Sequence, residues 1–259
     1  MMSKRSPLPL PVMSLLVSLV ISILFTQNGG TTALSTNGLS LGLDGDVDGE
    51  CVCELEKQPN FTEKADTARW LVHSLDWGVV STISSRLGQE EGQSVPFGNV
   101  YSFVDGPCEK STGIPYIYGT YMDQTYKDAI NNDMVSLTLS ESSLSSVCSH
   151  RKGLDSCMLG TKYGDPENPV CARLTLTGKL ITLNEKDSSS KEEYQFAKNA
   201  LFERHPSMAA WPAGHNWVIG KIDIQDIWLI DYYGGASILD PKDYFAAGLS
   251  ASEPLSSPL

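Results

Sequence analysis

The chain has 259 residues, which is enough for one sizeable hydrophobic core with residues to spare outside it. Acidic residues outnumber basic ones by 31 to 19, and the formal net charge at pH 7 is -12. Such a chain repels phosphate backbones, so nucleic acid is not expected among its partners.

The first 33 residues have the three parts of a secretory signal peptide. Lys4 and Arg5 form a short basic region, an apolar run follows at residues 12–25, and Ala33 fits a cleavage position after small polar residues. The run is short for a hydrocarbon core of about 30 Å, and an uncleaved signal anchor is the alternative interpretation. We therefore expect the secretory pathway, with an extracellular, lysosomal or vacuolar destination and membrane contact only through this peptide.

Residues 34–61 are rich in Gly, Asp and Ser and show little apolar periodicity. They are expected to form a disordered or loosely held extension. Asn60 opens an Asn-Phe-Thr sequon, which is a candidate N-glycosylation site in a secreted chain. The folded domain is expected at residues 62–248, followed by a flexible tail at residues 249–259.

Six cysteines suit disulfide bonding in an oxidising compartment, although the sequence alone does not fix the connectivity. Cys157 and Cys171 flank a polar loop that contains prolines, and we expect a bond between them. Cys108 and Cys148 form a second candidate pair. The C-x-C motif at Cys51 has no partner pair nearby, whereas zinc sites usually have four ligands.

The predicted elements begin with a helix at residues 61–77, for which Thr62 is expected to be the N-cap. A short helix at residues 121–133 and a clear helix at residues 190–205 follow later in the chain. Gly178 predicts a bend or bulge within a long strand. Mainly alternating apolar and polar residues predict strands at residues 78–85, 97–104, 114–120, 134–142, 171–185 and 216–233. Six such strands predict a small closed antiparallel barrel with flanking helices, in the α+β class.

The stretch from His205 to Trp217 contains two of the four histidines but does not have the spacing of a metal site. His205 and His215 are ten residues apart with two prolines between them, so they form no compact ligand pair. We predict a structural corner in which His205 ends a helix and Met208, Trp211 and Trp217 pack as apolar anchors. The sequence has no G-x-S-x-G motif, and no catalytic residue is assigned, although a Ser/His/Asp arrangement stays open.

Two groups of motifs resemble known families. The segments DWGVVSTISS, VPFGNVYSFVDG and GIPYIY resemble the opening of the flavin-mononucleotide (FMN)-binding split-barrel superfamily, which includes the pyridoxamine phosphate oxidases. The later blocks W-P-x-x-H-N-W and D-Y-x-G-G resemble the CREG family, the secreted cellular-repressor glycoproteins. The resemblance covers residues 65–247.

The resemblance implies a six-stranded split barrel in a homodimeric secreted or lysosomal glycoprotein, with a cell-surface or sorting receptor as a candidate partner. It also implies a vestigial flavin pocket, for which Thr82, Ser84 and Asn99 are the candidate lining residues. These uncharged donors are poor partners for a phosphate, and few cations lie near them in the sequence. We expect no cofactor and no enzymatic activity. The alternative is an FMN-dependent oxidoreductase of the pyridoxamine phosphate oxidase type.

Overall fold

The computed structural model describes residues 53, 57–88, 93–144 and 157–248. The predicted signal peptide, most of the predicted extension, Cys148 and the C-terminal tail lie outside the described residues. Among the described helices, none combines the length and the apolar character that a membrane crossing requires.

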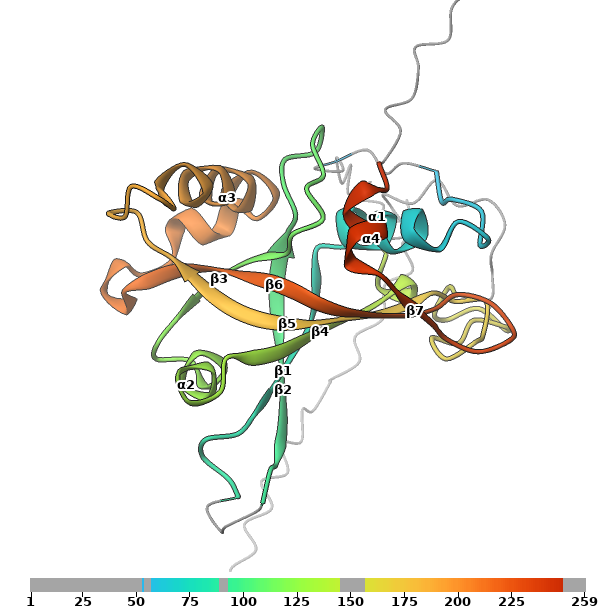
Figure 1. The fold of residues 1–259 in the computed structure, drawn as a ribbon, viewed down its shortest axis with the longest axis horizontal. Helices are drawn as coiled ribbons and strands as arrows, with labels where there is room; N and C mark the ends of the chain where they lie inside the picture. Colours follow the sequence, from blue (N-terminus) through green and yellow to red (C-terminus); the bar gives the residue numbers. More distant parts are fainter. Residues whose placement is uncertain (1–52, 54–56, 89–92, 145–156, 249–259) are drawn as a thin grey trace, which may run out of the picture. The chain divides into compact units, whose positions relative to one another are not determined.

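A closed antiparallel barrel of six strands forms the centre of the described structure (Figure 1). The strands follow the order β3-β2-β1-β4-β5-β6, and pairing of β6 with β3 closes the barrel. A short strand, β7, pairs with β6 outside the barrel. The strands are β1 (Trp77–Ile83), β2 (Pro96–Val104), β3 (Tyr116–Thr120), β4 (Met134–Ser140), β5 (Arg173–Leu183), β6 (Trp217–Ile230) and β7 (Ser237–Leu239). The predicted six-stranded split barrel is confirmed.

The long strands β5 and β6 pair along their lengths with one interruption. Their register shifts between Thr177 and Gly178, where the sequence predicted a bend or bulge. A Cβ atom on Gly178 would lie 2.0 Å from the carbonyl oxygen of Asp223, so a side chain has no room there. A bulge increases the local twist, which helps these strands to curl around the barrel.

Helices cover the barrel on several sides, and α1 and α4 lie side by side in Figure 1. The α-helices of the described residues are α1 (Lys64–Ser74), α2 (Gln124–Asn131), α3 (Lys191–Arg204) and α4 (Pro241–Ala246). The predicted N-cap is wrong, because α1 begins after Glu63 and Thr62 is not its cap. The Thr62 hydroxyl instead donates a hydrogen bond to Oδ1 of Asn60 at 3.0 Å.

The buried side chains form two cores. The larger core fills the barrel and continues under α1 and α4, where it includes Leu71 and Tyr244. The second core lies between α3 and the strands, and it includes Leu201 and Ile219. Met208, which follows α3, is buried in this second core as the sequence predicted.

The structure contains a bond between Cys157 and Cys171, but it corrects the second predicted disulfide. Cys108 is bonded to Cys53, with 5.3 Å between the Cα atoms, and is therefore not the partner of Cys148. The physical reason is the turn after β2, which packs on α1: Nε2 of His73 lies 3.0 Å from the Cys108 carbonyl oxygen. Because the segment of Cys53 leads into the same helix, the two cysteines meet across 55 residues of sequence.

Candidate functional site

The three residues predicted for a vestigial flavin pocket lie beside α2. Thr82 is in β1, Ser84 follows that strand, and Asn99 is in β2. Asn99 pairs with Val80, two residues before Thr82, so Asn99 and Thr82 occupy diagonal positions on one face of the sheet. The structure therefore brings these candidate residues close to one another.

Asp128 of α2 accepts hydrogen bonds from β1, from the residues just after that strand and from its own helix. The Thr82 hydroxyl donates to Oδ2 at 2.7 Å, and the amide and hydroxyl of Ser85 both donate to Oδ1 at 2.7 Å. The Gln124 side chain donates to the same oxygen at 2.6 Å. Burial alone would raise the pKa of Asp128, but these hydrogen bonds outweigh it, and the pKa lies below its ordinary value. Asp128 is therefore a buried carboxylate.

A second carboxylate, Asp123, caps α2 and binds β2. It accepts a hydrogen bond from the amide of Thr125 at 2.8 Å, as an N-cap residue does. The Asn99 amide donates to Oδ2 at 3.1 Å, and the Tyr101 hydroxyl donates to Oδ1 at 2.7 Å. Burial, helped by the bond to Asp123, raises the pKa of Tyr101 well above its ordinary value, so the phenol stays protonated as a donor.

The Ser84 side chain binds the backbone of the turn that follows β1. Its side-chain oxygen accepts hydrogen bonds from the amides of Arg86 and Leu87, both at 3.2 Å. All three candidate residues thus have partners within the chain. We call the cluster of Thr82, Asn99, Tyr101, Asp123 and Asp128 the α2 network.

The α2 network does not fit the phosphate of FMN, the cofactor of the superfamily that the sequence resembles. Among the hydrogen bonds of the described residues in this network, the groups that carry charge are two carboxylates, and no Lys or Arg takes part. A phosphate dianion is held best by charge-assisted hydrogen bonds from cations, and nearby carboxylates repel it. The hydroxyl of Thr82 and the amide of Asn99 already point their hydrogens at those carboxylates.

The histidine-containing stretch forms a corner between α3 and β6. Nε2 of His205 lies 3.1 Å from the Phe103 carbonyl oxygen, and burial lowers the pKa of this histidine. The His215 ring instead contacts the Trp217 ring, with 5.3 Å between the centroids. The two imidazoles therefore have separate partners, and His205 is the C-cap of α3 as predicted.

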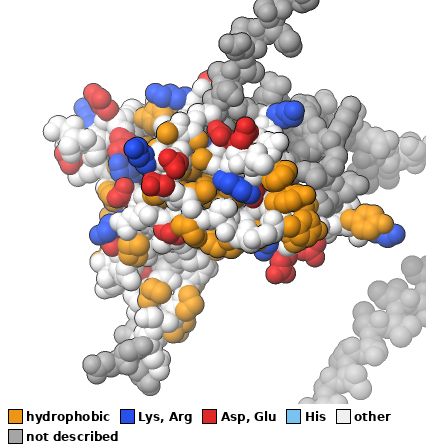
Figure 2. All heavy atoms as spheres, turned by 45° about the vertical axis from the view of Figure 1, so that its right-hand side comes forward, with side chains coloured by type: hydrophobic (Ala, Val, Ile, Leu, Met, Phe, Trp, Pro, Cys, Tyr) orange, Lys and Arg blue, Asp and Glu red, His pale blue; other side chains and the backbone are white. Residues whose placement is uncertain are grey.

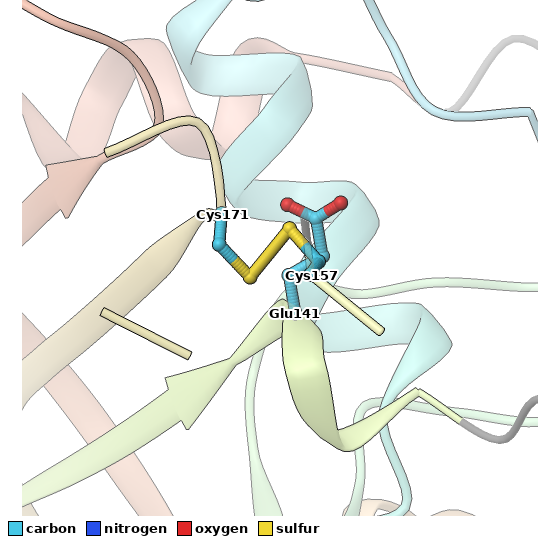
Figure 3. A group of neighbouring side chains, drawn as sticks. All are labelled: Glu141, Cys157 and Cys171. Carbon is cyan, nitrogen blue, oxygen red and sulfur yellow. A yellow bond between two sulfur atoms is a disulfide. The ribbon is translucent and has the colours of Figure 1, made fainter. Parts of the chain in front are cut away.

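One trio of metal-ligand side chains comes together in the described part of the chain: Glu141, Cys157 and Cys171 (Figure 3). Their candidate ligand atoms lie within 4.8 Å of one another, and all three residues are buried. However, the two sulfur atoms are bonded to each other, and a metal ligand has to be a thiolate. A carboxylate oxygen of Glu141 accepts a hydrogen bond from the Ala172 amide at 2.7 Å, which fixes the loop of the disulfide.

Comparison with known proteins agrees with this architecture. Residues 59–246 match the family model described as "CREG, beta-barrel". The chain belongs to the CREG family. It is 41% identical over 184 residues to human Protein CREG2, covering 71% of this chain and 56% of that protein. It is 35% identical to chicken Protein CREG1, covering 72% of this chain and 88% of that protein.

The chain thus spans just over half the length of the CREG2 proteins, 56% of the human and 59% of the mouse protein. Among solved structures, it resembles the heme binding protein from Mycobacterium smegmatis with a TM-score of 0.50. The identity is 15%, and the match covers 74% of this chain and 62% of the other. This likeness shows a shared fold of the CREG domain and carries no information on its ligand.

Sequence reasoning named two donors of the α2 network, Thr82 and Asn99, but missed the donor Tyr101 and both acceptors. Asp123 carried a weak signal, because Asp is a frequent N-cap residue, but the helix was predicted from residue 121 and so placed Asp123 inside it. Asp128 carried none, since its partner Thr82 lies 46 residues away in the sequence. A side-chain hydroxyl can donate to a ligand only where its hydrogen is not already bonded to an acceptor within the chain.

Proposed function

We propose that this CREG protein is a secreted or endolysosomal glycoprotein without enzymatic activity, which acts by binding other proteins through a dimeric barrel. The α2 network is the observation that carries the proposal, because it fills the candidate flavin site with two acids and their donors. A cell-surface or sorting receptor is the proposed class of partner.

The surroundings of Asn60 support a glycosylated, secreted protein. Asn60 is exposed, and its Oδ1 accepts hydrogen bonds from the amide and hydroxyl of Thr62, both at 3.0 Å. These contacts use the side-chain oxygen, and the glycan would be attached to the side-chain nitrogen. Two disulfides in the described residues also suit an oxidising compartment.

Exposed hydrophobic side chains support a role in protein binding. Figure 2 shows such side chains in patches among acidic and basic ones on the face that it presents. Phe61 and Tyr232 stack with 4.2 Å between their ring centroids, although they are 45% and 40% exposed. Tyr233, which is 67% exposed, contacts Tyr232 edge to face. Adjacent exposed aromatic residues are typical of protein interfaces.

A flavin titration tests the proposal. Protein collected from the medium of a eukaryotic host should be colourless and should not quench the fluorescence of FMN. We expect a dissociation constant weaker than about 100 µM, or about -5.5 kcal/mol. Submicromolar binding that is lost in Thr82→Val would favour the oxidoreductase instead. A protein retained in the cytosol with Met1 intact would contradict the secretory part of the proposal.

The outer face of the β1–β2 pair is the proposed dimer surface. Neither strand contains a charged residue. Val79 lies directly opposite Val100, which is 63% exposed, and Ile83 lies opposite Pro96. An exposed strand face without charges can pack against its own copy across a two-fold axis, so we propose that a homodimer covers it.

Val100→Asp is therefore expected to weaken the dimer by about 100-fold or more, since each two-fold interface would bury the new charge twice. Light scattering at micromolar concentration should give twice the chain mass for the natural protein and the single mass for this variant. Leu159→Asp is the matched control, because Leu159 is 62% exposed and belongs to the segment between β4 and β5, outside both strands. Loss of the dimer in the control alone, or a monomeric natural protein, would contradict this surface.

A further inference from the structure

An open pocket of about 680 Å³ lies where β5 ends and β6 begins. Its lining comes from four parts of the chain: Tyr121 after β3, the turn after β5, Tyr194 of α3 and the start of β6. None of these residues belongs to the α2 network. The volume is within the range of about 300–1,000 Å³ that is usual for sites of small molecules.

Aromatic side chains form fixed walls of the pocket. The Trp217 indole donates a hydrogen bond to the Pro212 carbonyl oxygen at 2.8 Å. Its ring is also stacked on Tyr118, with 5.1 Å between the centroids and 22° between the planes. The Tyr121 hydroxyl donates to the Thr182 hydroxyl at 3.3 Å. Because these contacts hold the rings in place, binding a flat ligand against them costs little side-chain entropy.

Amide groups stand next to these rings. Asn216 precedes Trp217, lines the pocket and has a left-handed backbone, with φ of 52°. Oδ1 of Asn184 accepts a hydrogen bond from the Lys186 amide at 2.9 Å, which orients the side chain while its NH₂ group keeps its donors. The pocket therefore offers donors and acceptors beside apolar ring faces.

The charges of the lining point to a neutral ligand. Glu185 and Lys186 are adjacent and carry opposite charges. The lining therefore attracts neither cations nor anions strongly. An aromatic cage for a quaternary ammonium group needs rings packed around one point. Among the ring contacts of the described residues, none joins any two of Tyr121, Tyr194 and Trp217, and Lys186 would repel such a cation.

We propose that this pocket binds a neutral oligosaccharide. A pyranose ring has C–H groups on its faces, which pack on aromatic rings, and hydroxyl groups around its edge, which bond to amides. The walls of Tyr121 and Trp217 would hold the ring faces. Asn184 and Asn216 would bind the hydroxyl groups. This inference does not rest on the proposed function, because neither flavin binding nor dimerisation involves these side chains.

Titration with chitotriose, followed by tryptophan fluorescence and by calorimetry, tests the proposal on the full secreted protein. We expect saturable binding that Asn216→Gly weakens about threefold to tenfold, by removing a hydrogen bond. Glycine keeps the left-handed backbone, so the fold should be unchanged in this variant. Tyr121→Ala should weaken binding by about tenfold or more, because it removes an aromatic wall. Tyr121 is 45% exposed, so this variant should also fold.

Tyr163→Ala is the control, since Tyr163 is 66% exposed and does not line the pocket. Its affinity for chitotriose should equal that of the natural protein. Absence of binding by folded protein up to about 10 mM would overturn the proposal. So would binding that Asn216→Gly and Tyr121→Ala leave unchanged, or binding of choline or inorganic phosphate in place of chitotriose.

Discussion

Tyr244→Ala is expected to lower the free energy of unfolding by about 3–5 kcal/mol, the usual cost of deleting a buried aromatic ring. The Tyr244 side chain is fully buried in the larger core, in the part that lies under α4, the last helix of the described residues. Its hydroxyl donates a hydrogen bond to the Gly113 carbonyl oxygen at 2.7 Å. Alanine would leave both a cavity and an acceptor without its donor.

The neighbouring contacts add to this effect. The Arg69 guanidinium of α1 lies 5.5 Å from the Tyr244 ring centroid and donates to the Ala247 carbonyl oxygen at 2.8 Å. The same guanidinium donates to the Ser111 carbonyl oxygen at 3.1 Å. Tyr244 thus helps to hold α4, α1 and the turn before β3 together, and its loss should loosen all three.

Urea unfolding measures this prediction. Phe245→Ala is the matched control, since the next residue is also aromatic but 43% exposed, and it should cost about 1 kcal/mol or less. Tyr244→Phe isolates the hydroxyl and should cost about 1–3 kcal/mol, because the Gly113 oxygen stays buried. Equal effects of alanine at both positions would show that Tyr244 does not anchor α4.

The features that follow from local pattern are the barrel strands and their bulge. The strands follow from alternation, and the bulge at Gly178 follows from a glycine inside a long strand. β7 and α4 went unpredicted because three and six residues are too few to show a period. α4 forms because tertiary contacts such as those of Tyr244 hold it, which no local pattern reports.

The candidate site was harder to predict because its chemistry depends on pairs distant in sequence. Thr82 and Asn99 lie near each other in β1 and β2, yet whether they face a ligand or an internal acceptor depends on how α2 folds back. The Cys53–Cys108 bond has the same origin, since the two cysteines meet only when α1 has packed beside the turn after β2. Both features are tertiary, whereas the sequence patterns are local.

Asp128→Ala is expected to cost about 3 kcal/mol or more, because it removes a buried charged acceptor from one buried and two partly buried donor residues at once. Thr82, Ser85 and Gln124 would all lose their shared partner. Asp133→Ala is the control, since Asp133 forms an exposed ion pair with Lys179 and should cost about 1 kcal/mol or less. A small effect at Asp128 would mean that the α2 network does not hold α2 on the barrel.

The pH dependence distinguishes the charge of Asp128 from its volume. Because the pKa of Asp128 is lower in the folded state than in the unfolded state, the carboxylate stabilises the fold above the unfolded value of about 3.9. That stabilisation is lost as pH falls through the folded pKa. The stability difference between the natural protein and Asp128→Asn should therefore be constant from neutral pH to about pH 5, the range of an acidic organelle, and shrink below about pH 4.

Urea unfolding midpoints of both proteins, measured across this pH range, test the prediction. If the stability difference already disappears between pH 7 and pH 5, a group other than Asp128 titrates there. Constancy over that range would mean that the Asp128 carboxylate keeps its charge and holds α2 on the barrel from neutral pH down to about pH 5.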